Sequence, residues 1–235
     1  MLRKVVPLMI MTLGALLQTS PVPLRALDLE LAGLVPVSIP AGRVSLLPVT
    51  QADLDGDSTL ETIRLTDGRA AILSGSQTVW QSPAAWMVLQ AEITNLNHDN
   101  APEVTLLVWR PFQPWPVDQW LPHGGRIDSF HDADGQSCHI ILIGWTRGGY
   151  HELWAGSAMA DPITSFAVAD LNNDNVQELV ALEGRYADPR SAPARTLKVW
   201  EWNGFGFTVV SEMEGTFSKM TLVEAEDGRI LILVP

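Results

Sequence analysis

A short acidic motif occurs three times in this chain with its oxygen-bearing residues in the same places. It reads DLDGDSTLE at 53–61, NLNHDNAPE at 95–103 and DLNNDNVQE at 170–178. In each copy an Asp, Asn or Glu stands at the first, third, fifth and ninth position. A motif repeated in register predicts that the chain is built from copies of one supersecondary unit.

The spacing of the copies predicts the size of that unit. The first two copies start 42 residues apart and the last two 75 apart, and a weaker copy from Asp132 falls in the longer interval. A looser echo, VEAEDGRILILV, occurs near the C-terminus. Short apolar runs bounded by turn residues flank the copies and predict strands. Repeats near 40 residues with about four short strands each indicate a β-propeller, here of about five blades.

Two segments carry a family resemblance, ADLDGDSTLETIRL at 52–65 and FAVADLNNDNVQELVALEG at 166–184. They resemble the FG-GAP/VCBS repeats of integrin α-chain propellers and of many exported bacterial proteins, and the likeness extends loosely from Val44 to the C-terminus. The resemblance implies an all-β, propeller-like array of four-stranded blades, in which each acidic loop joins the first two strands of a blade and often holds Ca²⁺. Propellers of this family usually have seven blades. This shorter chain is therefore expected to be a smaller propeller, an incomplete ring or a ring that closes with a partner.

The acidic loops are candidate Ca²⁺ sites, because Ca²⁺ takes six to eight oxygen ligands and a tight loop presents alternate residues to its interior. The loop at 53–61 has four carboxylates, the loop at 170–178 three and the loop at 95–103 two, so the expected affinity falls in that order. Asn and Asp also cap tight turns without a metal, and this alternative is strongest for the loop at 95–103. The predicted ligands are Asp53, Asp55, Asp57, the Thr59 carbonyl and Glu61 in the first loop, and Asp170, Asn172, Asp174, Val176 and Glu178 in the third.

The first residues predict export. Arg3 and Lys4 precede an apolar run of 13 residues at 5–17, and QTSPVPLRA follows, which is typical of a secretory signal peptide cleaved near Ala26. The run is shorter than the roughly 20 residues that span a bilayer as a helix. An uncleaved N-terminal anchor is the alternative. The predicted organisation is a signal peptide at 1–26 and a single propeller-like domain at 27–235, exported to the periplasm or the cell exterior with no membrane span after cleavage.

Charge restricts the class of partner. Without residues 1–26 the chain has 12 basic and 27 acidic residues, a formal net charge of −15. Such a surface repels nucleic acid and anionic lipid. We therefore expect divalent cations, and a protein or carbohydrate ligand at the propeller surface, rather than nucleic acid.

The segment WRPFQPWPVDQWLPHGG at 109–125 interrupts the repeat. Its four prolines argue against a central strand. Exposed aromatic side chains here would stack on sugars or anchor a protein partner, and the alternative is that they pack down over a blade edge. The predicted ligand- or partner-binding residues are Trp109, Phe112, Trp115 and Trp120.

Two hairpins are also predicted. In TLKVWEWNGFGFTVV at 196–210, a two-residue turn at 203–204 would pair Trp202 with Phe205. A two-residue turn at 134–135 would place His131 opposite Cys138, with His139 on the other face.

A thiol beside a base can be a nucleophile or half of a zinc site, but the spacing matches no catalytic or zinc motif. A packed thiol beside an edge histidine explains the pattern equally well. The sequence therefore favours an exported, non-catalytic binding module with structural Ca²⁺. The alternatives are a hydrolase or lyase that uses His131, Cys138 and His139, and a purely structural accessory subunit.

Overall fold

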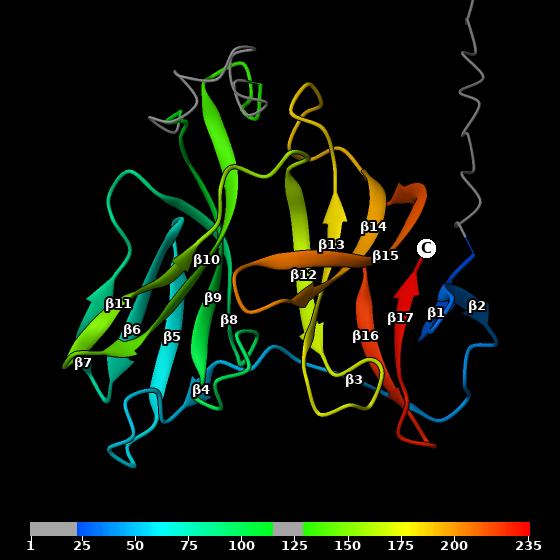
Figure 1. Ribbon diagram of the computed structural model, residues 1–235, viewed down its shortest axis with the longest axis horizontal. Helices are drawn as coiled ribbons and strands as arrows, with labels where there is room; N and C mark the ends of the chain where they lie inside the picture. The colour runs from blue at the N-terminus through cyan, green and yellow to red at the C-terminus, as the bar shows by residue number, and fades with distance from the viewer. Residues whose placement is uncertain (1–22, 115–128) are drawn as a thin grey trace, which may run out of the picture.

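The computed structural model describes residues 23–114 and 129–235, which form four antiparallel sheets (Figure 1). We call the sheets blades 1 to 4. Blade 1 consists of β4 (Gln51–Ala52), β5 (Glu61–Thr66), β6 (Arg69–Ser74) and β7 (Gln77–Gln81), and blade 2 of β8 (Met87–Thr94), β9 (Glu103–Pro111), β10 (Gln136–Thr146) and β11 (Gly149–Ala155). Blade 3 consists of β12 (Ile163–Ala169), β13 (Glu178–Glu183), β14 (Ala194–Trp202) and β15 (Phe207–Phe217).

Blade 4 combines strands from both ends of the chain. Its order is β3 (Arg43–Ser45), β16 (Thr221–Ala225), β17 (Ile230–Val234), β1 (Arg25–Glu30) and β2 (Gly33–Val37). Ala26 of β1 is buried and lies opposite Leu233 of β17. Most of the predicted signal peptide lies outside the described residues. Its proposed last residue, Ala26, belongs to a core strand. Within the described ranges, no helix is long and apolar enough to cross a membrane.

The described residues form four blades, and the prediction of about five is wrong. The 75-residue interval is a single blade, because the weak copy at Asp132 precedes β10 and joins the second and third strands of blade 2 rather than starting a new one. The looser echo near the C-terminus joins β16 to β17, which take the places of the first and second strands of the other blades, with β3 added at the edge beside β16. Counting every acidic turn as a blade start overestimated the number, because such turns also connect later strands.

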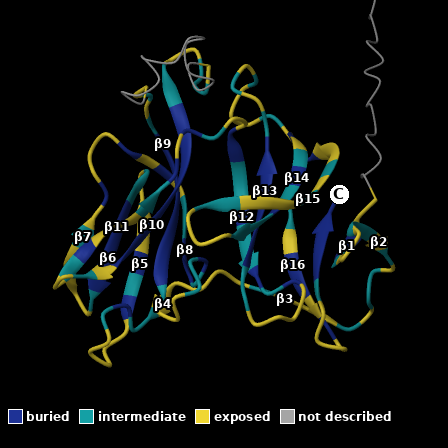
Figure 2. Ribbon diagram, viewed as in Figure 1, coloured by how far each residue is buried: buried dark blue, intermediate teal, exposed yellow. Residues whose placement is uncertain are grey.

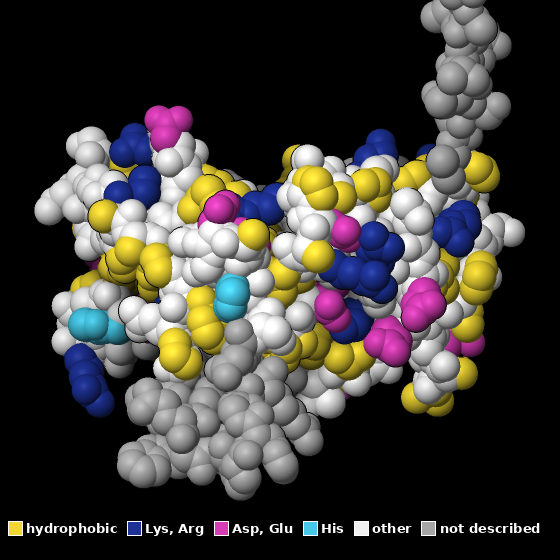
Figure 3. All heavy atoms as spheres, turned by 90° about the horizontal axis from the view of Figure 1, so that it is seen from above, with side chains coloured by type: hydrophobic (Ala, Val, Ile, Leu, Met, Phe, Trp, Pro, Cys, Tyr) yellow, Lys and Arg dark blue, Asp and Glu magenta, His cyan; other side chains and the backbone are white. Residues whose placement is uncertain are grey.

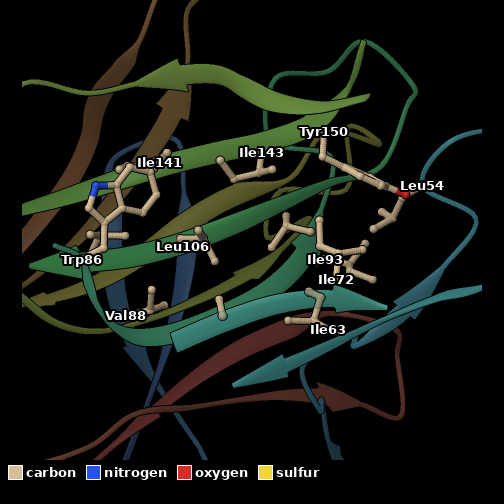
Figure 4. Packing of buried hydrophobic residues seen from close by; sticks show 13 residues of the cluster. Leu54, Ile63, Ile72, Trp86, Val88, Ile93, Leu106, Ile141, Ile143 and Tyr150 are labelled. Carbon is tan, nitrogen blue, oxygen red and sulfur yellow. The ribbon is translucent and has the colours of Figure 1, made fainter. Parts of the chain in front are cut away.

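Three apolar clusters hold neighbouring blades together. Figure 4 shows the one between blades 1 and 2, where Ile63 and Ile72 face Leu106 and Ile141. A second cluster joins blades 2 and 3, and a third joins blades 3 and 4. Blade 2 packs on both sides, so β9 and β10 are buried along almost their whole length and lack the apolar–polar alternation of a half-exposed strand (Figure 2).

The four blades form an arc that is not closed by packing between blades 1 and 4. Among the described strands, extensive contacts between sheets link only blades 1 and 2, 2 and 3, and 3 and 4. The far face of blade 4 has a fourth cluster around Leu231, but its members come from that sheet and from residues 37–39. Blades 1 and 4 lie at opposite ends of the long axis (Figure 1). The predicted all-β, propeller-like architecture is confirmed, with the four described blades arranged in an open arc.

One connection runs between the two ends of the arc, from β3 to β4. The Leu46 N–H donates to the Leu222 carbonyl at 2.9 Å, and the Val49 carbonyl accepts from the Ile93 N–H at 2.8 Å. This segment, the β3–β4 connection (residues 46–50), therefore lies against the first strands of blades 4 and 2.

The β14–β15 hairpin has a wider turn than predicted. Trp202 lies opposite Phe207 rather than Phe205, because the turn spans four residues and the Asn203 N–H donates to the Gly206 carbonyl at 2.9 Å. The Asn203 side chain stabilises this turn by accepting the Phe205 and Gly206 N–H groups, each at 3.0 Å. Phe205 consequently projects from the tip and is 89% exposed.

Candidate functional site

The three acidic loops have one backbone conformation. Each joins the first and second strands of its blade, which confirms that expectation. Their fourth and sixth residues all have positive φ, a conformation that Gly, Asn and Asp adopt most readily. These residues are Gly56 (80°) and Ser58 (71°), His98 (59°) and Asn100 (64°), and Asn173 (59°) and Asn175 (69°).

A buried glutamate closes each loop. It occupies the ninth position, begins the second strand of the blade and is at most 1% exposed in all three copies. One of its oxygens accepts the N–H of the buried leucine at the second position, which fixes the loop to the start of the blade. The pairs are Glu61 with Leu54 at 2.9 Å, Glu103 with Leu96 at 2.7 Å, and Glu178 with Leu171 at 2.7 Å.

The first loop brings three of its predicted ligands together. Asp53, Asp55 and Glu61 each place a carboxylate oxygen within 4.8 Å of the other two. Asp57 lies outside this group and accepts the Thr59 N–H at 2.7 Å. Oε1 of Glu61 is buried with no hydrogen-bond partner among the described residues. A hard cation would satisfy that oxygen, so the donor set fits Ca²⁺.

A residue that the sequence did not single out lies beside this group. Tyr150 of β11 in blade 2 is 8% exposed, and its hydroxyl points toward the loop next to Leu54 (Figure 4). Burial, followed by the negative charge of Glu61 and of the nearby aspartates, raises the pKa of this phenol. No local sequence signal could have found Tyr150, because it belongs to another blade.

The third loop is held by its own hydrogen bonds. Asp174 donates its N–H to Asp170 at 3.1 Å and accepts the Val176 N–H at 2.8 Å. The Asn172 amide donates to Glu178 at 3.1 Å. Burial, and then the charges of Asp174 and Asp170, raise the pKa of Glu178 to about 7. Within the described chain this loop forms no group of three carboxylates as close as that of the first loop.

The second loop is tied to the third. The Asn95 N–H donates to the Gln177 side chain at 2.7 Å, and the His98 ring lies 3.3 Å from the Gln177 carbonyl. Glu103 accepts the Thr94 hydroxyl at 2.7 Å, while burial raises its pKa to about 7. Hydrogen bonds of this kind can hold the loop without a metal. This agrees with the alternative that Asn and Asp side chains cap a tight turn here.

Of the four predicted partner-binding aromatics, Trp109 and Phe112 lie within the described residues, and neither is fully exposed. Trp109 lies in β9, is 3% exposed and makes an edge-to-face contact with Tyr186 at 5.7 Å. Phe112 is half-buried against the His131 ring at 5.1 Å. Trp115 and Trp120 lie outside the described residues. For Trp109 the structure shows the packing alternative, and the role of the rest of this segment stays a prediction.

The structure does not form the predicted His131–Cys138 pair. The β9–β10 register places Trp109 opposite Cys138, because the connection turns between Asp132 and Gln136, whose backbone groups bond at 2.8 Å. Cys138 is 0% exposed, and burial raises the pKa of its thiol to about 12. A thiol in this state is a poor nucleophile and a poor zinc ligand.

His139 is also a packed residue. Its Nδ1 donates to the Gly156 carbonyl at 3.0 Å, and its Nε2 accepts the Ser137 hydroxyl at 2.7 Å. Burial, reinforced by the charge of Arg110, lowers its pKa to about 4. The ring is therefore neutral at physiological pH, and both of its nitrogens are used in hydrogen bonds.

The open side of the arc exposes apolar side chains. Val44 is 68% exposed, Leu47 82% and Val49 52%. Their sequence, VSLLPV, predicts a strand leading into a blade and gives no sign of exposure. On the face seen from above, acidic and basic side chains are interspersed with apolar ones (Figure 3).

Comparisons with known proteins add little. No protein-family model and no curated protein matches the chain. One similar solved structure is described as the crystal structure of BBS1N in complex with ARL6DN, soaked with mercury. It is 14% identical, and the match covers 85% of this chain and 68% of that chain with a TM-score of 0.30. A likeness this distant carries no argument about function, and the four blades are established by their own sheet pairing.

Proposed function

We propose that this chain is an exported, non-catalytic interaction module, built of FG-GAP/VCBS-type blades and stabilised by Ca²⁺ in its acidic loops. The observation that carries the binding role is the open side of the arc. There, Val44 of β3 and Leu47 and Val49 of the β3–β4 connection are exposed to solvent. Exposed apolar patches on a soluble protein mark contact surfaces.

The character of this surface favours a protein partner over a carbohydrate. Its exposed side chains are aliphatic, and such groups pack into the apolar centre of a protein interface. Sugars are bound mainly on aromatic faces, which the three residues named above lack. A carbohydrate ligand would have to use other aromatics, such as Trp115 and Trp120.

Calcium in the first loop would have a structural role. Bound to Asp53, Asp55 and Glu61, it would neutralise three carboxylates that otherwise repel one another. It would also occupy the free oxygen of Glu61 at the boundary with blade 2. The site would then stabilise blade 1, which packs against one neighbour.

The binding role is tested by affinity capture from the native exported fraction. Leu47→Asp and Val49→Asp place a charge on side chains that are already in solvent, so the fold should be retained while partner capture is lost. Phe205→Asp is the matched control, because Phe205 is at least as exposed as Leu47 and Val49 but lies at the β14–β15 turn. Capture of the same partners by wild type and by Leu47→Asp would contradict this assignment of the surface.

A further inference from the structure

A cavity of about 310 Å³ lies at the centre of the arc. It is lined by the β3–β4 connection and by residues of β8, β12 and β16, the first strands of blades 2, 3 and 4. Leu47 and Val49 belong to its lining and are exposed, so the cavity opens toward the uncovered side of the arc. Its volume is at the lower end of the range of small-ligand sites.

The walls of the cavity combine apolar side chains with polar groups and one charged side chain. Phe166, Met220 and Leu222 supply apolar surface, while Glu92 is the charged residue among the described lining. Glu92 is 5% exposed. No ion pair within the described ranges includes it. A buried carboxylate without a counter-ion is costly, so its presence in a cavity needs an explanation.

A neighbouring amide fixes the orientation of this carboxylate. The Gln90 side chain bridges blades 2 and 3, with Nε2 donating to the Phe166 carbonyl at 2.6 Å and Oε1 accepting the Phe166 N–H at 3.1 Å. The same Nε2 donates to Oε1 of Glu92 at 2.5 Å. Within the described chain no hydrogen bond is formed to the other oxygen of Glu92, and the residue lines the cavity.

We propose that this cavity binds a primary ammonium group carried on a short apolar chain, with Glu92 as its counter-ion. An ammonium has three donors. Glu92 accepts one, and the hydroxyls of Ser165 and Thr221, which line the same cavity, are further acceptors. The apolar walls cover the hydrocarbon chain. The group belongs either to a free alkylamine or to a lysine of a protein docked on the open side of the arc.

Butylammonium chloride is the probe, and butan-1-ol is its uncharged counterpart of similar size. Isothermal titration at neutral pH and fixed ionic strength should show binding of the ammonium and none of the alcohol. Glu92→Gln should weaken ammonium binding at least about tenfold, as loss of a charge-assisted contact does. Glu214→Gln, an exposed carboxylate on β15, should leave it unchanged.

A second variant and a second probe complete the test. Ser165→Leu fills the cavity and should abolish ammonium binding. If Glu92→Gln does not fold, this variant tests whether the ammonium binds in the cavity. A capped Ala-Lys-Ala peptide that binds more tightly than butylammonium indicates a protein lysine, whereas binding of the free amine alone indicates a small molecule. Absence of ammonium binding, equal binding of the alcohol, or an unchanged affinity in Glu92→Gln would overturn the proposal.

Discussion

The glutamates that close the acidic loops are buried carboxylates whose protonation depends on folding. The pKa of Glu178 rises from 4.5 to about 7, and that of Glu103 does the same. The folded chain therefore binds more protons than the unfolded chain between these values. Each group contributes stability that is present below about pH 4.5 and is lost as the pH rises to 7. His139 works in the opposite direction, since its pKa falls from 6.5 to about 4, so the effect must be isolated one residue at a time.

Glu178→Gln isolates this effect for the third loop. Its amide oxygen can still accept the Leu171 N–H but carries no charge. In chelator, the melting temperature of the variant should be close to that of wild type at pH 5 and above it at pH 8. Thermal melts at both values measure the difference, with Glu214→Gln as the exposed control. A variant that is destabilised equally at both pH values would show that the charge of Glu178 has no such cost.

The expected order of Ca²⁺ affinity among the three acidic loops is also a prediction at the scale of the residue. Chelation should lower the melting temperature of wild type, and Ca²⁺ should restore it better than Mg²⁺, which prefers strict octahedral geometry. A hundredfold excess over Kd stabilises by about 2.7 kcal/mol. Asp55→Asn should remove most of this response. Asp57→Asn should remove less, because its carboxylate lies outside the close group, and Asp99→Asn little.

The measurement is a thermal melt of the three variants with chelator, with Ca²⁺ and with Mg²⁺. Identical melting of the wild type in all three conditions would mean that the loops are capped turns and that no metal stabilises the fold.

At the level of the element, the sequence predicts those features of loops and strands that depend on residues adjacent in the chain. The acidic loops and most strand positions follow from local patterns, whereas the place of the loops between first and second strands was implied by the family resemblance. Registers do not follow in the same way. The β14–β15 turn is four residues wide because the Asn203 side chain caps it, and the Asn-Gly pair alone predicts the tighter turn. In the β9–β10 connection the chain turns between Asp132 and Gln136, which places Cys138 opposite Trp109 rather than opposite His131.

The observed hairpin register predicts that substitution of Phe207 and of Phe205 by Ala lowers the free energy of unfolding by different amounts. Phe207 packs edge-to-face against Trp202 at 5.3 Å and Trp154 at 5.2 Å. Phe207→Ala should lower the free energy of unfolding by about 2 kcal/mol, and Phe205→Ala by less than about 0.5 kcal/mol. Chemical denaturation of both variants measures this. The reverse order would restore the pairing of Trp202 with Phe205.

At the scale of the whole molecule, the number of neighbours should set local stability. Blade 1 shares a core with blade 2 alone, whereas blade 2 packs against blades 1 and 3. The open arc, Tyr150 beside the first loop and the central cavity all depend on residues far apart in the sequence. Local sequence patterns therefore could not predict these three features. The same patterns predicted the number of blades only approximately.

Hydrogen exchange in chelator tests this order of stability. Amides of β6 should exchange at least about tenfold faster than those of β9, because blade 1 can open without disrupting the core between blades 2 and 3. Addition of Ca²⁺ should reduce the difference in exchange rate between β6 and β9. Equal protection of β6 and β9 in chelator would indicate that the four blades unfold as one cooperative unit.

The composition of blade 4 determines when the molecule can finish folding. β1 pairs with β17, and the Arg229–Asp28 ion pair joins residues 201 apart in the sequence. During synthesis, β1 must therefore wait without its partner strand β17 until nearly all of the described chain has emerged. Long-range pairing of this kind is slow and leaves strand edges open to aggregation. A chaperone that shields β1 and β2 would speed maturation without changing the final stability.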